Sequence, residues 1–186
     1  MQALPESRFT PATDLCPHPE HWLSTDDDST ECQVSEMVAG VIRGLQPRYV
    51  VETGSAWGQT AEAIGKALLK NGHGLLDTIE PDNERAVRTT MRTEGLPVRV
   101  HKVPSMDFVP AMTIDFAFFD SLLELRIPEF WRYHRFMRVG TIVAFHDTRP
   151  GRELRWQLED LTSMLRVMHM PTPHKITFRE MLTNSR

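Results

Sequence analysis

Two polar groups that follow apolar runs late in the sequence contain the residue types that bind divalent cations. Asp120 follows the apolar run of residues 114–119, and His146 with Asp147 follows the run of residues 141–145. If these runs are neighbouring parallel strands, their carboxyl ends meet at one crevice of the sheet. Two carboxylates, completed by water and substrate oxygens, are a ligand set that Mg²⁺ accepts. Asp120 and Asp147 therefore predict a metal site, which would lower the pKa of a bound hydroxyl.

His146 lies between these carboxylates in the predicted site. Because histidine titrates near neutral pH, His146 is a candidate general base or an additional metal ligand. The alternative is a histidine that ends its strand and contacts solvent. The two aspartates also have an ordinary alternative, since aspartates in turns often bond local N–H groups.

The segment 50–60 reads as a strand followed by a glycine-containing turn that begins a helix. A dinucleotide site needs the spacing G-x-G-x-x-G, so that the pyrophosphate can approach the backbone. Here only Gly54 and Gly58 occur, with Trp57 between them, and no Gly-Lys-Ser/Thr follows. The turn favours a ligand without phosphate, such as an amino-acid moiety with its amine near Glu52. A tight turn that binds nothing is the alternative.

Glu80 follows the next predicted strand, about one strand–helix–strand unit after Gly54. It would therefore lie at the same edge of the sheet as that glycine. A carboxylate in this place can accept hydrogen bonds from both hydroxyls of a ribose. The alternative is a charge that stabilises the next helix N-terminus, which Asp82 could do instead.

The elements that must position these side chains follow from the hydrophobic pattern. Short apolar runs alternate with stretches of helical spacing, which is typical of parallel strands joined by crossover helices. We therefore predict an α/β, doubly wound Rossmann-like fold. The predicted strands are residues 49–53, 75–79, 98–103, 114–119 and 141–145, and the helical stripes lie near residues 35–45, 61–69, 86–91, 130–137 and 154–165.

Length and composition limit the remaining choices. The chain has 186 residues, enough for about one domain. We expect an N-terminal arm over residues 1–31, which lack apolar periodicity, and the folded domain over residues 32–186. The net charge of -4 without a basic block argues against nucleic-acid binding. Because we find neither a signal-peptide pattern nor a membrane-length apolar run, we expect no membrane partner and a cytoplasmic location.

The segments 51–60, 80–82, 114–120 and 140–148 in combination resemble the class I S-adenosylmethionine-dependent methyltransferases. The resemblance is to the small-molecule O-methyltransferase branch, which includes the catechol-type and macrocin-type enzymes, and it covers the chain from about residue 35. It implies a mostly parallel seven-stranded sheet with helices on both faces and a C-terminal antiparallel hairpin. It also implies S-adenosylmethionine (SAM) as cofactor, a hydroxylated small molecule as substrate, and assistance by Mg²⁺ or another divalent cation.

The resemblance assigns roles to particular residues. Glu52, Gly54, Ser55 and Gly58 would hold the methionine part of the cofactor, Glu80 and Pro81 the ribose, and Ser105 and Met106 the adenine, while Asp120 would lie beside the transferred methyl and bind the metal with Asp147. The chain departs from the branch at Leu123, where Lys or His often takes the hydroxyl proton. It also has His146 where an apolar or acidic residue is common.

Other functions remain open on the sequence. The apolar pair Leu122 and Leu123 at the expected catalytic rim would suit a methyltransferase-like protein that binds the cofactor, or nothing, and serves a structural or interaction role. A nicotinamide dehydrogenase lacks its third glycine, and a nucleic-acid methyltransferase lacks its Asn/Asp-Pro-Pro-aromatic signature. Residues 1–31 could form a substrate lid or a contact within a homodimer.

Overall fold

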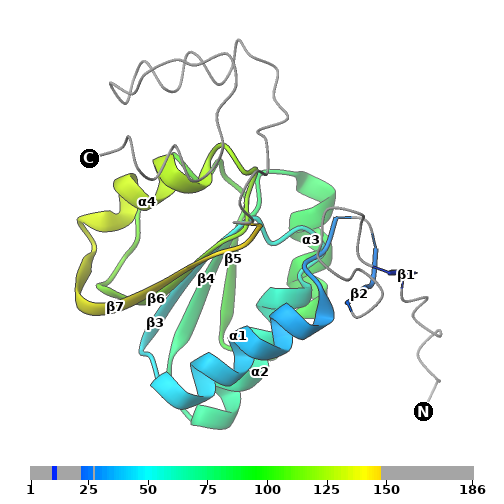
Figure 1. Cartoon of the computed structure of the whole chain (residues 1–186), viewed down its shortest axis with the longest axis horizontal. Helices are drawn as coiled ribbons and strands as arrows, with labels where there is room; N and C mark the ends of the chain where they lie inside the picture. The colour runs from blue at the N-terminus through cyan, green and yellow to red at the C-terminus, as the bar shows by residue number, and fades with distance from the viewer. Residues whose placement is uncertain (1–9, 12–21, 27, 148–186) are drawn as a thin grey trace.

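The computed structural model describes residues 10–11, 22–26 and 28–147 (Figure 1). Its main sheet has five parallel strands in the order β5-β4-β3-β6-β7. These are β3 (Tyr49–Thr53), β4 (Leu75–Ile79), β5 (Val98–His101), β6 (Ile114–Phe119) and β7 (Met137–Phe145). The order reverses direction between β3 and β6, which creates the switch point of a doubly wound sheet. The predicted α/β fold is confirmed in this part of the chain.

Helices cover both faces of the sheet (Figure 1). Helix α1 (Cys32–Leu45) and α2 (Gln59–Asn71) pack against Val50 and Phe116, whereas α4 (Arg126–His134) packs against Val51 and Phe119. Successive strand residues thus enter opposite cores, and the central strands β3, β4 and β6 are rich in apolar residues on both faces for that reason. The remaining elements are α3 (Asn83–Arg92) and a small hairpin of β1 (Thr10–Pro11) and β2 (Leu23–Ser24).

Several predicted boundaries need correction. Met137, which we placed on a helical stripe, begins β7, because α4 ends at His134 and the chain turns at Phe136. Strand β5 ends at His101, two residues earlier than predicted. The main sheet of the described part has five strands rather than seven, and the predicted terminal hairpin and the helix over 154–165 lie outside the described residues.

Helix α1 begins at Cys32, the residue at which we place the boundary between arm and domain. That division stays a prediction. None of the helices in the described ranges combines the length and the apolar character that a bilayer crossing requires.

Candidate functional site

The predicted site residues lie at the carboxyl edge of the sheet because the hydrogen-bond ladder continues past the strand ends. The first residue after β3, β4, β6 and β7 donates its N–H to the last residue of the neighbouring strand. These bonds run from Gly54 to Ile79 (2.9 Å), from Glu80 to His101 (3.0 Å), from Asp120 to Thr53 (3.0 Å) and from His146 to Phe119 (3.1 Å). Each site residue is thus fixed by the backbone of the next strand.

A cavity of about 1090 Å³ opens at this edge. It brings together most of the residues predicted from the sequence, namely Gly54, Glu80, Pro81, Ser105, Met106, Asp120, His146 and Asp147. Leu122 and Leu123 also border it, as does Trp57. The remaining predicted residues, Glu52, Ser55 and Gly58, are buried and do not line it.

The conformation and the close contacts of the turn after β3 require glycine at positions 54 and 58. Gly54 has φ +79°, and a Cβ there would lie 2.5 Å from the carbonyl oxygen of Asp120. Gly58 has φ +81°, and its Cβ would lie 2.9 Å from the Cα of Thr89 on α3. Gly54 thus permits the close approach of two strand ends at the cavity, whereas Gly58 permits α2 and α3 to pack. Ser55 belongs to the second contact, because its hydroxyl lies 3.3 Å from that of Thr89.

Glu52 is a buried acid beneath the cavity floor. One carboxylate oxygen accepts a hydrogen bond from the Thr78 hydroxyl, and the other, Oε1, has no partner among the described residues. Burial raises the pKa of Glu52 to about 8. At neutral pH the side chain therefore holds its proton, and it lies beneath the cavity rather than in its lining.

Glu52→Gln should remove a pH-dependent loss of stability. The folded chain holds the proton of Glu52 up to about pH 8, whereas the unfolded chain releases it near the usual pKa of 4.5. The contribution of Glu52 to stability is therefore fully present below pH 4.5 and is lost as the pH rises from there through about 8. We expect Glu52→Gln to exceed wild type by about 2 kcal/mol or more at pH 8, and by much less at pH 5. Urea unfolding at both pH values measures this, and a difference independent of pH would contradict it.

Glu80 is oriented by the backbone. Its Oε2 accepts from the N–H of Ala56 and its Oε1 from the N–H of Asp82, both at 3.0 Å. Asp82 performs the capping that we considered for Glu80, since its side chain accepts from the N–H of Arg85. The carboxylate of Glu80 is thus fixed at the cavity wall, and burial raises its pKa.

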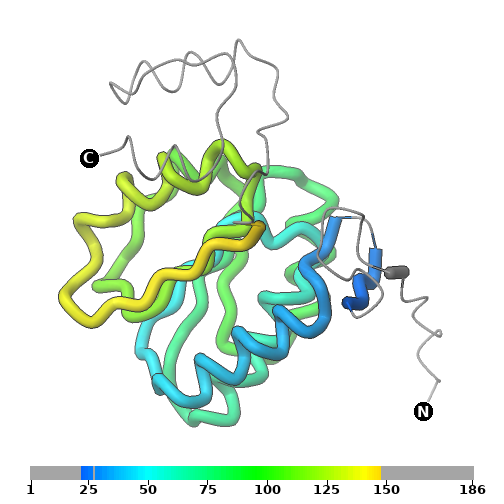
Figure 2. Tube along the Cα trace, viewed as in Figure 1, coloured from blue at the N-terminus to red at the C-terminus, as the bar shows by residue number. Residues whose placement is uncertain are grey.

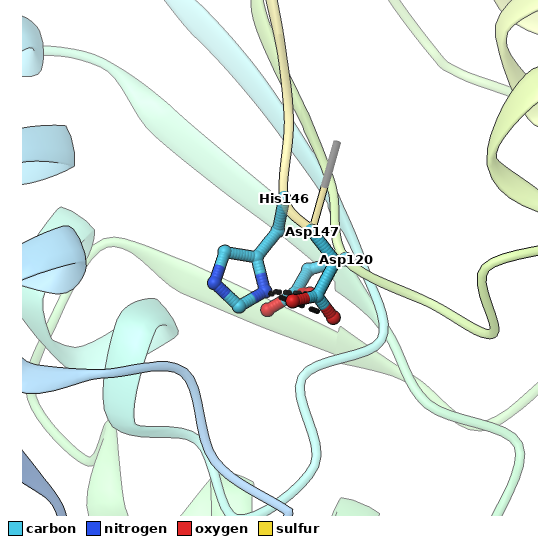
Figure 3. A group of neighbouring side chains, drawn as sticks. All are labelled: Asp120, His146 and Asp147. Atoms are coloured by element: carbon cyan, nitrogen blue, oxygen red, sulfur yellow. Dashed lines mark hydrogen bonds and ion pairs between the residues drawn. The ribbon is translucent and has the colours of Figure 1, made fainter. Parts of the chain in front are cut away.

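Asp120, His146 and Asp147 come together as the sequence predicts (Figure 3). His146 Nδ1 lies 2.8 Å from Asp120 Oδ1 and 3.7 Å from Asp147 Oδ2, and Nε2 lies 2.8 Å from Glu31 Oε2. Burial opposes protonation, but Asp120 and Glu31 outweigh it and raise the pKa of His146 to about 10. Both ring nitrogens thus face carboxylate oxygens, which suits an orienting role, and the role of general base or additional metal ligand stays a prediction.

Arg126 was missed in the sequence and lies at the centre of this group. Its Nη2 is 3.0 Å from Asp120 Oδ1 and 3.6 Å from Asp147 Oδ2, and its side chain is 5% exposed. It also donates to the carbonyl oxygens of Ser121 and His146. A signal exists, because an arginine at the first position of a helix opposes the helix dipole and needs nearby carboxylates.

Glu129 on α4 is a second missed residue. It is fully buried and accepts hydrogen bonds from the hydroxyls of Thr53 (2.7 Å) and Ser121 (2.8 Å). It therefore connects the ends of β3 and β6 from below the cavity. Nothing in its local sequence distinguishes it from an exposed helix glutamate.

The arm supplies one wall of the cavity, a role that the sequence left open. Figure 2 shows this segment, in blue, beside the turn that leads into α2. The amide of Gln59 donates to the carbonyl of Thr30 (3.0 Å), and Arg85 pairs with Asp28 (2.8 Å). Thr30 also donates to Asp120 Oδ2. The arm thus contacts both the turn and the acidic group.

The comparisons with known proteins agree with this fold. The family model described as Methyltransferase domain matches residues 51–148. Similar solved structures include the methyltransferase PaMTH1 of Podospora anserina bound to S-adenosylhomocysteine (SAH), at 13% identity and TM-score 0.60, covering 66% of this chain and 55% of that one. They also include the O-methyltransferase TomG of Streptomyces achromogenes in complex with SAM, at 21% identity and TM-score 0.52, covering 60% of this chain and 54% of that one. A third is the O-methyltransferase of Bacillus cereus in complex with SAH, at 16% identity and TM-score 0.56, covering 63% and 57%.

The matched region spans little more than half the length of these three proteins. A search of curated proteins returns no match.

Proposed function

Because the chain belongs to the methyltransferase-domain family, we propose that it transfers a methyl group from SAM to a hydroxyl of a small molecule. The resemblance to class I methyltransferases predicted from the sequence is confirmed by that membership. The choice of a hydroxyl acceptor is supported by the similar fold of enzymes named as O-methyltransferases.

The cavity residues fit the cofactor on two observations. Gly54 borders the cavity and presents backbone without a side chain, and the place of a Cβ is taken by the backbone of Asp120 and Ser121. Glu52 lies beneath the floor, so its contact with the amine of the cofactor stays a prediction. The observation that carries the proposal is the carboxylate of Glu80, fixed at the cavity wall by two backbone N–H groups and suited to the two hydroxyls of a ribose. Ser105 and Met106 line the cavity where we propose the adenine.

When bound, SAM supplies an activated methyl group on a positively charged sulfur. The chain has to hold the acceptor oxygen in line with that methyl and to accept the hydroxyl proton. We assign the proton to the carboxylate of Asp147, which borders the cavity. Asp120 and His146 orient the acceptor instead, because Asp120 already accepts several hydrogen bonds and His146 already carries a proton.

A divalent cation would be held by Asp120 and Asp147, with His146 as a third donor. The arrangement of these residues does not fit such an ion. A guanidinium, that of Arg126, lies between the two carboxylates, and both nitrogens of His146 face carboxylate oxygens. The proposal therefore contains no step that depends on a metal.

Methyl transfer is tested by the formation of SAH. The full chain, incubated with methyl-labelled SAM and a pool of phenols, catechols and polyols, should transfer label to at least one acceptor. The reactions are run with and without Mg²⁺, and boiled protein is the control. No transfer to any acceptor under either condition, with SAM left intact, would contradict the proposal.

A cofactor-binding protein without catalysis is the second candidate. Leu123 at the position of the usual base and the protonated His146 favour it. Binding of SAH in calorimetry combined with no turnover would support this candidate. A small-molecule substrate, the absence of nucleic-acid and membrane partners, a homodimer and a cytoplasmic location stay predictions.

A further inference from the structure

We propose that Arg126 supplies the positive charge that a divalent cation would supply between Asp120 and Asp147, so that the acceptor site works without a metal. The inference concerns the charge arrangement of this chain and rests on the proposed function only where turnover is measured.

The guanidinium of Arg126 is held on several sides. Its Nε donates to the carbonyl of Ser121 (2.9 Å), Nη1 donates to the carbonyl of His146, and Nη2 faces Asp120 and Asp147. The side chain is nearly inaccessible to solvent. A planar group held by backbone carbonyls and a carboxylate stays in one orientation, unlike an arginine on the surface.

The carboxylate of Asp120 has little capacity left for a metal. Oδ1 accepts from both Arg126 and His146, and Oδ2 accepts from the hydroxyl of Thr30. A carboxylate offers about four acceptor positions, so most are used. A divalent ion at this place would also lie close to the guanidinium of Arg126, which is always positively charged, and would be repelled by it.

Arg126 can also stabilise negative charge on an acceptor oxygen, as a metal ion would. The guanidinium has five N–H donors, and Ser121, His146, Asp120 and Asp147 face four of them. Arg126 borders the cavity, so the second N–H of Nη1 is left for an acceptor oxygen. A fixed donor stabilises the negative charge that develops on that oxygen as it loses its proton.

The experiment measures metal binding rather than activity. Mn²⁺ is titrated into the full chain and followed by electron paramagnetic resonance, for wild type, Arg126→Met and Arg126→Gln. Wild type should bind no Mn²⁺ at this site below about 1 mM. The neutral variants should gain one Mn²⁺ site at least about tenfold tighter, since weak oxygen sites lie near 10⁻⁴–10⁻³ M. Adding Asp147→Asn to either variant should remove the gained site.

Thermal unfolding provides a second readout. Removing Arg126 takes away the guanidinium that lies beside both Asp120 and Asp147, and Mn²⁺ should replace it. At 1 mM, Mn²⁺ should raise the Tm of the neutral variants by about 5 °C and leave wild type unchanged. Arg126→Gln retains a donor for the carbonyls of Ser121 and His146 and guards against a purely structural failure of Arg126→Met.

Three results would overturn the inference. The first is a Mn²⁺ site in wild type that Asp147→Asn removes. The second is a folded neutral variant that gains no site. The third is failure of both neutral variants to fold even in 1 mM Mn²⁺. A loss of wild-type turnover in EDTA would speak against the inference as well, whereas an absence of turnover in every condition would concern only the proposed function.

Discussion

Glu80→Ala should weaken the binding of SAH by about 100-fold or more in isothermal titration calorimetry. The carboxylate of Glu80 borders the cavity and is oriented by the N–H groups of Ala56 and Asp82. Hydrogen bonds from two ribose hydroxyls to a charged acceptor contribute about 1.5–3 kcal/mol each. The loss of both corresponds to about 100-fold or more in affinity.

Glu84→Gln is the matched control for this substitution. Glu84 also borders the cavity, but it is exposed and pairs with Arg88 on the surface of α3. We expect its effect on SAH affinity to stay within about twofold, because exposed charges contribute little. Unchanged affinity in a folded Glu80→Ala variant would contradict the ribose assignment. A wild-type chain that binds no SAH would contradict the cofactor itself.

Gly54→Ala should lower the free energy of unfolding by about 3 kcal/mol or more and should abolish SAH binding. The added Cβ would lie 2.5 Å from the carbonyl oxygen of Asp120 and 2.6 Å from the Cα of Ser121. These are backbone atoms at the end of β6, so they cannot rotate away. Overpacking typically costs about 1–3 kcal/mol, and the φ of +79° adds about 1–2 kcal/mol for a residue with a side chain.

Gly72→Ala isolates the steric part of that loss. Gly72 has φ +75°, almost the value at Gly54, but no atom lies within 4 Å of its ideal Cβ. It should therefore cost only the conformational 1–2 kcal/mol, about what an alanine with positive φ costs, and leave SAH binding intact. Urea unfolding of both variants gives the comparison. Equal losses would show that the contact between the ends of β3 and β6 is unimportant.

The sequence predicts the floor of the site because that floor follows from strand ends. β3, β4 and β6 have the predicted boundaries, since each is a short, mostly buried run rich in apolar residues that a turn residue follows. The residue after each run, such as Glu80 or Asp120, therefore lies at the common edge. Glu52, which we expected to contact the ligand, is beneath the floor because it is the penultimate residue of β3 and its side chain is buried.

The side-chain contacts across the site could not be predicted in the same way. Thr30 bonds to Asp120 from 90 residues away, and Glu31 reaches His146 across 115 residues. Hydrophobic periodicity places elements, but it does not state which polar side chains meet after the elements pack. The position of the Arg126 guanidinium depends on how α4 lies on the sheet. For that reason the prediction of a metal site did not anticipate that this guanidinium would lie between the two carboxylates.

The backbone hydrogen bonds that continue past the strand ends divide the site into two parts, and local opening of these two parts requires different free energies. Gly54, Glu80 and Asp120 are hydrogen-bonded to the last residues of neighbouring strands, so they separate only when the sheet itself opens. The arm is attached to the site through contacts such as Thr30 to Asp120 and Asp28 to Arg85, and detaching it leaves the sheet whole. The local openings of lowest free energy in a protein break contacts of this kind, between a peripheral segment and the folded core. The described part of the arm can therefore detach at a lower free energy than the floor of the cavity, which keeps its shape as long as the sheet is folded.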